Sequence, residues 1–325
     1  MKLTILGAGA WGTALARLLE AGGNEVTLWG HRAQGLEEIL QTGRNERFLP
    51  GIALPAGLVL ESDLRRAIAG AECIVVAVPS QPFREVTRHL ADYSGPVVSV
   101  AKGIEDKSGL TMCGILAGNA PKARRAALSG PSFAIEVARD IPTAIVAASP
   151  DPATAAWVQQ LFNRPAFRVY TSTDQLGVEL GGALKNVIAI AAGVGDGLGF
   201  GDNSKAALVT RGIVEISRLG VACGARAGTF TGLSGLGDLM ATCFSRHSRN
   251  RSFGERVGRG EKPAAIAAST LAVAEGYPTA HSAYHLARKH GVVTPVIDEV
   301  YAMLYEGKDV SRTVRDLMSR DLKAE

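Results

Sequence analysis

The chain has 325 residues, of which 46% are hydrophobic and 20% charged, and its 35 basic and 31 acidic side chains leave a net charge of only +4. This composition excludes a disordered or fibrous protein, and so small a net charge gives no support for a nucleic-acid partner, which we do not expect. The length predicts about two domains. Glycine is over-represented, with 38 residues against the roughly 23 expected from an average composition.

Cysteine usage and hydropathy predict a cytoplasmic protein without a metal site or a membrane span. The four cysteines form no CxxC pair, and no histidine cluster lies near them at metal-ligand spacing, which favours reduced thiols. Residues 1–16 carry an early lysine and an apolar run like a signal peptide, but a specific glycine spacing interrupts the run. No segment reaches the ~18 uninterrupted apolar residues that a bilayer span needs.

Strand and helix signals alternate through the first half of the chain. Residues 2–6 and 25–29 are predicted strands, with a helix over 11–21 between them. Further strands are predicted at 58–61, 73–78, 96–101, 126–129, 143–148 and 167–170, with helices that include 82–90 and 152–162. Short β-rich runs alternating with helices predict an α/β fold: a doubly wound, mostly parallel sheet covered on both faces.

Helical patterns dominate after about residue 174. They cover residues 177–193, 205–219, 262–270, 280–290 and 296–304, and strand signals nearly vanish. The change in pattern predicts a domain boundary near 174–180. We therefore expect an α/β domain of residues 1–176 followed by an all-helical domain of residues 177–325.

Gly7, Gly9 and Gly12 form a GxGxxG pattern between the first predicted strand and the first predicted helix. In a dinucleotide-binding βαβ unit the first glycine permits the tight turn, the second lets the backbone approach a pyrophosphate, and the third allows close helix–strand packing. The helix N-terminus supplies N–H groups and partial positive charge to the phosphates. The alternative, a purely structural turn, is disfavoured by the position of the motif.

The end of the second predicted strand indicates which nucleotide binds. An enzyme specific for NAD usually has Asp or Glu there to hold the ribose 2′-hydroxyl. This chain has Gly30, His31 and Arg32 instead. Arginine suits a 2′-phosphate, so NADP is favoured, with NAD use left open. The alternative for Arg32 is a solvated surface side chain.

Lys185 is the candidate proton donor for a nicotinamide-dependent reduction. It follows Gly181 and Gly182 on an otherwise apolar helix, and these two glycines are expected to leave space for a ligand beside the ammonium. Burial would lower the pKa of the amine toward the range of an acid–base catalyst. The alternative is a lysine whose charged end reaches solvent.

Three further candidates follow predicted strands, where open α/β sheets bind ligands. Lys102 follows the strand at 96–101, and Gly130 and Ser132 follow the strand at 126–129. Each of these segments also fits an ordinary loop.

Asp238, Ser248, Arg249 and Asn250 form a second polar cluster in the helical half. Guanidinium, hydroxyl and amide donors together suit a phosphate group. The alternatives are a solvated basic loop or an RNA contact, and the scarcity of aromatic residues disfavours RNA.

Taken in order, these motifs resemble the bacterial NAD(P)-dependent glycerol-3-phosphate dehydrogenase family over nearly the whole chain. The segments that carry the resemblance include GAGAWGTALA, NERFLPGI, AKGIE, LSGPSFA, GGALKNV, GLSGLGDLMATC, SRNRSFG and AEGYPTA. The resemblance implies a Rossmann-like domain followed by a helical domain. It also implies reversible, NAD(P)H-dependent reduction of dihydroxyacetone phosphate to sn-glycerol 3-phosphate, a precursor of glycerophospholipids.

The resemblance also assigns roles to individual residues. Lys185 matches the proton donor and acceptor, and Lys102 matches a lysine that contacts both substrate and cofactor. The implied substrate contacts are Gly130, Ser132, Asp238, Ser248, Arg249 and Asn250. The implied cofactor contacts are Ala10, Trp11, His31, Ala134, Arg249, Val273 and Glu275. The family often has Ser or Thr at the position of Ala10, and Arg32 is not fixed in it.

Two other functions and one assembly state complete the expectations. A reductase of another small oxo-acid is disfavoured by the phosphate-suited cluster at 248–251. A non-catalytic NADP-sensing regulator would not need Lys185, Lys102 and that cluster together. A homodimer is expected only because dimers are the commonest assemblies among soluble oligomers.

Overall fold

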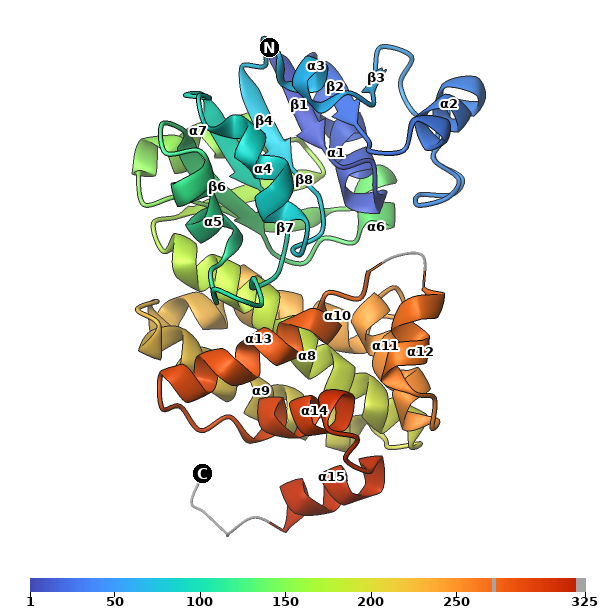
Figure 1. Ribbon diagram of the computed structural model, residues 1–325, viewed down its shortest axis with the longest axis vertical. Helices are drawn as coiled ribbons and strands as arrows, with labels where there is room; N and C mark the ends of the chain where they lie inside the picture. The colour runs from blue at the N-terminus through green and yellow to red at the C-terminus, as the bar shows by residue number, and fades with distance from the viewer. Residues whose placement is uncertain (271–272, 320–325) are drawn as a thin grey trace. The chain divides into compact units, whose positions relative to one another are not determined.

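The computed structural model describes residues 1–270 and 273–319 and divides into two compact units (Figure 1). Unit 1 comprises Met1–Lys102 and Leu110–Glu179, and unit 2 comprises Gly103–Gly109 and Leu180–Glu325. The division after residue 179 lies three residues from the expected boundary. The assignment of the short segment 103–109 to unit 2 has no counterpart in the sequence pattern.

Unit 1 is built on one eight-stranded sheet in the order β3-β2-β1-β4-β5-β6-β7-β8. All neighbouring strands are parallel except β6 and β7. The strands are β1 (Lys2–Leu6), β2 (Glu25–Trp29), β3 (Val59–Glu61), β4 (Cys73–Val76), β5 (Pro96–Ser99), β6 (Arg124–Ser129), β7 (Thr143–Ala148) and β8 (Phe167–Ser172). The strand order reverses at β1, which creates the crevice where such sheets bind ligands.

Helices cover both faces of this sheet, which confirms the predicted doubly wound fold. Alternate residues of β4 join different cores: Val75 packs in the cluster that contains Leu15 and Phe162, whereas Val76 packs in the cluster that contains Leu116. The helices are α1 (Ala10–Glu20), α2 (Ala33–Thr42), α3 (Leu64–Ile68), α4 (Phe83–Thr87), the 3-10 turn η1 (Arg88–Leu90), α5 (Met112–Asn119), α6 (Ala134–Ala138) and α7 (Pro152–Phe162).

Unit 2 is helical in its described residues, as predicted. Its long helix α8 (Gln175–Gly197) begins in unit 1 and runs through the middle of the helical unit (Figure 1). The other elements are α9 (Asp202–Ala222), η2 (Ala227–Thr231), η3 (Leu233–Gly237), α10 (Asp238–Phe244), α11 (Arg249–Gly258), α12 (Pro263–Ser269), α13 (Gly276–Lys289), α14 (Pro295–Tyr305) and α15 (Val310–Met318).

Close helix packing accounts for much of the glycine in unit 2. A Cβ atom on Gly193 of α8 would lie 1.9 Å from the carbonyl oxygen of Arg251, and one on Gly254 of α11 would lie 2.0 Å from that of Ile190. The backbones of α8 and α11 therefore approach more closely than any side chain allows. The prediction that Gly181 leaves space for a ligand is wrong. The backbone of Ser234 fills that space, because a Cβ on Gly181 would lie 2.7 Å from the Ser234 carbonyl oxygen.

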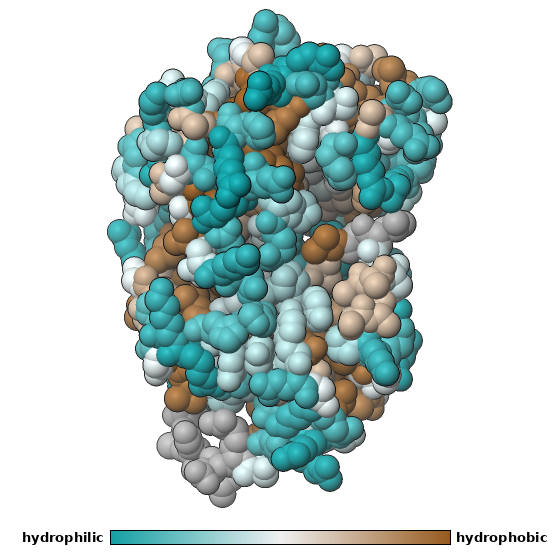
Figure 2. All heavy atoms as spheres, in the orientation of Figure 1, coloured by the Kyte–Doolittle hydropathy of each residue, from teal (hydrophilic) through white to brown (hydrophobic). Residues whose placement is uncertain are grey.

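Helix α8 is long and apolar enough to cross a membrane, but its surroundings identify it as a core helix. Of its most apolar stretch, 94% is buried inside the protein. Figure 2 shows that hydrophilic residues cover much of the visible surface of both units. The hydropathy of α8 therefore reflects burial against the surrounding helices.

Candidate functional site

The turn between β1 and α1 has the backbone geometry predicted for the glycine motif. Gly7 has φ +126°, and a Cβ on Gly12 would lie 1.9 Å from the Gly7 carbonyl oxygen. Gly9 is the N-cap of α1 and provides no side-chain cap. A Cβ on Gly9 would meet no heavy atom within 4 Å. An open helix N-terminus at the switch point of the sheet fits the pyrophosphate of a dinucleotide.

A buried asparagine that the motif analysis missed anchors this turn. The side-chain amide of Asn45 donates to the carbonyl oxygen of Ala8 at 3.0 Å and to Thr13 Oγ1 at 2.8 Å. Asn45 is only 3% exposed. Asn45 lies in the segment NERFLPGI, but no sequence spacing predicts its contact with Thr13, 32 residues earlier in the chain.

The end of β2 presents positive rather than negative groups. His31 and Arg32 are exposed, and Arg32 is the N-cap residue of α2. The neighbouring carboxylate of Glu61, at the end of β3, accepts two hydrogen bonds from the Arg66 guanidinium. Nε donates to Oε2 at 3.0 Å, and Nη2 donates to Oε1 at 2.9 Å. Hydrogen bonds from Arg66 lower the pKa of Glu61 to about 2. The side chains exposed just after β2 are therefore basic, and the nearest carboxylate on β3 is already ion-paired.

Lys102, Gly130 and Ser132 lie together beyond the carboxyl ends of β5 and β6. The carbonyl oxygen of Gly130 accepts from Lys102 Nζ at 2.8 Å and from Ser132 Oγ at 2.9 Å. Gly130 has φ +146°, a conformation that favours glycine. These three residues, predicted from two separate segments, therefore form one cluster in unit 1, and Ala134 begins α6 just after it.

Lys185 lies in a buried polar trio in unit 2. Its Nζ atom donates to Asp238 Oδ1 at 2.8 Å and to Thr242 Oγ1 at 2.5 Å. Thr242 Oγ1 in turn lies 2.6 Å from the carbonyl oxygen of Asp238 and donates to it. Lys185 is 6% exposed, Asp238 2% and Thr242 3%. Sequence reasoning missed Thr242, although it lies four residues after Asp238 and hence on the same helix face.

The electrostatics of this trio favour a charged amine. A carboxylate at hydrogen-bond distance stabilises the ammonium form and so opposes the desolvation that burial imposes. The thiol of nearby Cys243 is unreactive as a nucleophile, because burial raises its pKa to about 12 and keeps it protonated near neutral pH.

Ser248, Arg249 and Asn250 form the start of helix α11 rather than a loop. Ser248 Oγ caps the helix by accepting from the Arg251 N–H at 3.1 Å. Asn250 is buried: its amide donates to Asn186 Oδ1 at 2.8 Å, and its own Oδ1 accepts from the Gly276 N–H at 2.8 Å. A ten-residue helix whose first turn carries an arginine provides the N–H groups and charge that an anion needs.

The remaining predicted cofactor residues are spread over both units. Ala10 and the half-buried Trp11 begin α1, whereas Val273 is exposed just before α13 and Glu275 is the N-cap residue of α13. Arg249 is exposed, and Glu275 lies close enough to interact with it electrostatically. These two predicted cofactor contacts are thus brought together.

An ion-pair network beside α11 was also missed. Asp196, at the end of α8, pairs with Lys205 Nζ at 2.6 Å and with Arg251 Nε at 2.5 Å. All three side chains are less than one-fifth exposed. The network links α9 and α11 to the end of α8. It therefore helps to fix the first turn of α11, which is the predicted phosphate-binding turn.

Comparison with known proteins places both halves of the chain in one enzyme family. Residues 2–155 match the family model of the NAD-dependent glycerol-3-phosphate dehydrogenase N-terminus, and residues 174–315 match that of the C-terminus. Glycerol-3-phosphate dehydrogenase (NAD(P)+) from Geobacter sulfurreducens is 50% identical over 330 residues, covering 100% of this chain and 98% of that protein. The enzyme from Chlorobium limicola is 46% identical, with 100% and 99% covered.

A solved structure shows the same fold. The crystal structure of glycerol-3-phosphate dehydrogenase from Coxiella burnetii superimposes with a TM-score of 0.94 at 36% identity, covering 98% of this chain and 99% of that one. The glycine turn, the buried lysine trio and the full-length matches lead to one conclusion. The chain belongs to the NAD(P)-dependent glycerol-3-phosphate dehydrogenase family of oxidoreductases.

Proposed function

We propose that the chain reduces dihydroxyacetone phosphate to sn-glycerol 3-phosphate in the cytoplasm, reversibly, and so supplies the precursor of glycerophospholipids. The observation that carries this proposal is the buried trio of Lys185, Asp238 and Thr242. A reduced nicotinamide nucleotide, when bound, supplies the hydride to the carbonyl carbon. The carbonyl oxygen then needs one proton, and the Lys185 ammonium is the group that donates it.

Asp238 and Thr242 hold the amine through this step. Their two oxygen atoms fix the position of Nζ, and the carboxylate stabilises the charged form before the proton is given up. The neutral amine left behind regains a proton from water before the next turnover. In the oxidative direction, the same neutral amine accepts the proton of the glycerol hydroxyl.

The substrate phosphate is assigned to the first turn of α11. Arg249 offers a planar fork of donors, and Ser248 and Asn250 fix the turn in place. Lys102, Gly130 and Ser132 are proposed as further substrate contacts, and Lys102 also as a cofactor contact. The polar cluster in which these three residues meet supports that assignment.

The cofactor is assigned to the glycine turn of Gly7, Gly9 and Gly12, with NADP favoured over NAD. His31 and Arg32 at the end of β2 support the preference for a 2′-phosphate. Ala10, Trp11, Ala134, Val273 and Glu275 are proposed as further contacts. A homodimer remains the proposed assembly, to be tested by light scattering.

Lys185→Arg is the sharpest test of the proposed chemistry. Arginine keeps the positive charge beside Asp238 but does not give up a proton near neutral pH. We expect turnover of dihydroxyacetone phosphate, followed by NADPH absorbance, to fall by about a hundredfold or more. Lys122→Arg, at an exposed pair with Asp92, is the matched control and keeps full activity. Unchanged turnover in Lys185→Arg would refute the assignment, and unchanged NADPH absorbance in the wild type would refute the substrate.

A further inference from the structure

Two histidines outside the proposed active site lie side by side on the surface of unit 2. His281 and His285 are one helical turn apart on α13, and their Nε2 atoms are 3.3 Å apart. The His281 side chain is 32% exposed and His285 is exposed. Both Nε2 atoms belong to side chains that solvent reaches, and neither residue has a role in the proposed reaction.

A carboxylate holds the other ring nitrogen of His281. Asp106 Oδ1 lies 2.5 Å from His281 Nδ1. The segment that carries Asp106 is also tied to α13 at the adjacent position, where Ser282 Oγ donates to the Ile104 carbonyl oxygen at 3.1 Å. When the neutral His281 ring donates its Nδ1 proton to Asp106, its lone pair is on Nε2, the atom that lies 3.3 Å from His285 Nε2.

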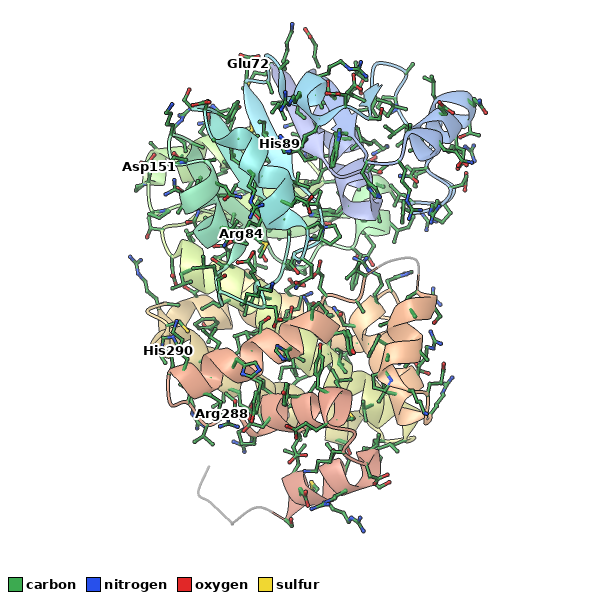
Figure 3. The ribbon with its side chains drawn as sticks, viewed as in Figure 1. Glu72, Arg84, His89, Asp151, Arg288 and His290 are labelled. Carbon is green, nitrogen blue, oxygen red and sulfur yellow. The ribbon has the colours of Figure 1, made fainter. Side chains whose placement is uncertain are left out.

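Aromatic side chains confine both rings. Tyr305 and Tyr301 of α14 lie 5.2 and 5.7 Å from the His281 ring, and Tyr284 meets the His285 ring edge-on at 5.3 Å. The nearby cation Arg288, labelled in Figure 3, is paired with Asp298 at 2.6 Å. The histidine pair is thus held in place, and the neighbouring positive charge is balanced.

The separation of the two nitrogen atoms matches that of a metal chelate. Two Zn–N bonds of about 2.1 Å spanning this separation enclose an angle of about 104°, near the tetrahedral value. The present contact needs one proton between the nitrogen atoms. For a metal ion to bind there, neutral His285 adopts the tautomer with its proton on Nδ1, so that both Nε2 atoms offer a lone pair to the ion and no net proton is released.

We propose that His281 and His285 form a two-histidine site for a divalent transition metal of the Zn²⁺, Ni²⁺ or Cu²⁺ type. Imidazole nitrogen is a preferred ligand of all three ions. Asp106 orients His281 as carboxylates orient metal-binding histidines generally. Among the residues that the structure describes, no group of three or more His, Cys, Asp or Glu side chains could hold a metal. Water therefore completes the coordination, and binding is reversible.

Calorimetric titration of the full-length protein, without an affinity tag, with ZnCl₂ and NiCl₂ tests the site. One ion should bind per chain. His281→Gln and His285→Gln should each weaken binding at least tenfold, and Asp106→Asn should weaken it by about 10–100-fold. His290→Gln is the matched control, because His290 is an exposed histidine at the C-terminal end of α13 (Figure 3). Its affinity should equal that of the wild type.

Two results would overturn the proposal. One is binding that persists at full strength in the double variant of His281 and His285, which would locate the metal elsewhere. The other is an electron paramagnetic resonance spectrum of the Cu²⁺-loaded wild type without nitrogen hyperfine splitting. This second measurement needs no variant, so it holds if a substitution perturbs folding. Metal-free turnover of each histidine variant should match the wild type and serves as the folding check.

Discussion

Single hydrogen bonds decide the state of the proposed catalytic amine. Lys185, Asp238 and Thr242 are all buried, and hydrogen bonds join the three side chains to one another. Removing one partner from such a buried set costs more than the bond itself, because a charged group loses its solvation as well. Thr242 is therefore as informative a target as Lys185.

Thr242→Val removes the hydroxyl with little change of volume. We expect the maximal rate to fall about 10–100-fold, the usual effect of one hydrogen bond to a charged group, with a smaller change in KM. Thr242→Ser keeps the hydroxyl and should retain most of the rate. Steady-state kinetics of both variants test this role, and equal rates for valine and serine would contradict it.

Arg32→Ala tests the nucleotide preference at the same scale. Removing the guanidinium should weaken NADPH binding by about tenfold or more, since a charge-assisted bond to a phosphate is lost. NADH has no 2′-phosphate, so its affinity should change little. Fluorescence titration with both nucleotides measures the difference, with Arg65→Ala, on exposed α3, as control. Equal losses for both nucleotides would show that Arg32 does not contact that group.

At the level of elements, helix contacts place the functional residues. Where α8 and α11 cross, Asn250 Nδ2 donates to Asn186 Oδ1 at 2.8 Å. Asn186 follows Lys185 in the sequence, and Asn250 follows Arg249. Glycines at this crossing allow the close approach. The proposed proton donor and the proposed phosphate turn are therefore joined through one helix–helix contact.

Gly254→Ala should disturb that contact. The added Cβ would lie 2.0 Å from the Ile190 carbonyl oxygen, so the two backbones must move apart. We expect the free energy of unfolding to fall by about 1–3 kcal/mol or more, the usual cost of overpacking. Urea denaturation measures the loss. Gly228→Ala, where a Cβ meets no heavy atom within 4 Å, should change stability little.

For the whole molecule, one buried carboxyl group couples stability to pH. Glu179 on α8 accepts from Thr111 Oγ1 at 2.9 Å and from the Cys113 N–H at 2.8 Å, at the start of α5. Burial raises its pKa to about 7, although both hydrogen bonds oppose the shift. The native state therefore binds an extra proton between the unfolded pKa of about 4.5 and about pH 7.

The sign of the effect follows from this raised pKa. The stability contributed by the protonated group is complete below about pH 4.5 and is lost as the pH rises through about 7. Glu179→Gln keeps an acceptor oxygen and removes the titration. Its free energy of unfolding, measured by urea between pH 5 and 8, should fall less steeply with pH than that of the wild type. Parallel profiles would show that Glu179 does not control the slope.

Local sequence patterns determined the fold class and the nucleotide turn. Strand runs, helical periodicity and the GxGxxG spacing act over a few residues, so β1, β2, β7 and α7 were predicted with the bounds that the structure shows. No residue range was predicted for helices α2, α3, α5, α6, α10, α11 and α15. The first turn of α11 is dense in arginine and serine, which resembles a loop until tertiary contacts bury its other face.

Only the tertiary structure decided how distant residues meet. Lys185 and its two partners are separated by 53 and 57 residues, and Asn45 reaches back 32 residues to Thr13. Asp106 meets His281 across 175 residues, because the segment 103–109 packs with unit 2. No local periodicity encodes such pairs, since they depend on how whole elements pack. The sequence by itself determined which chemistry the chain could carry, and packing decided which side chains share each site.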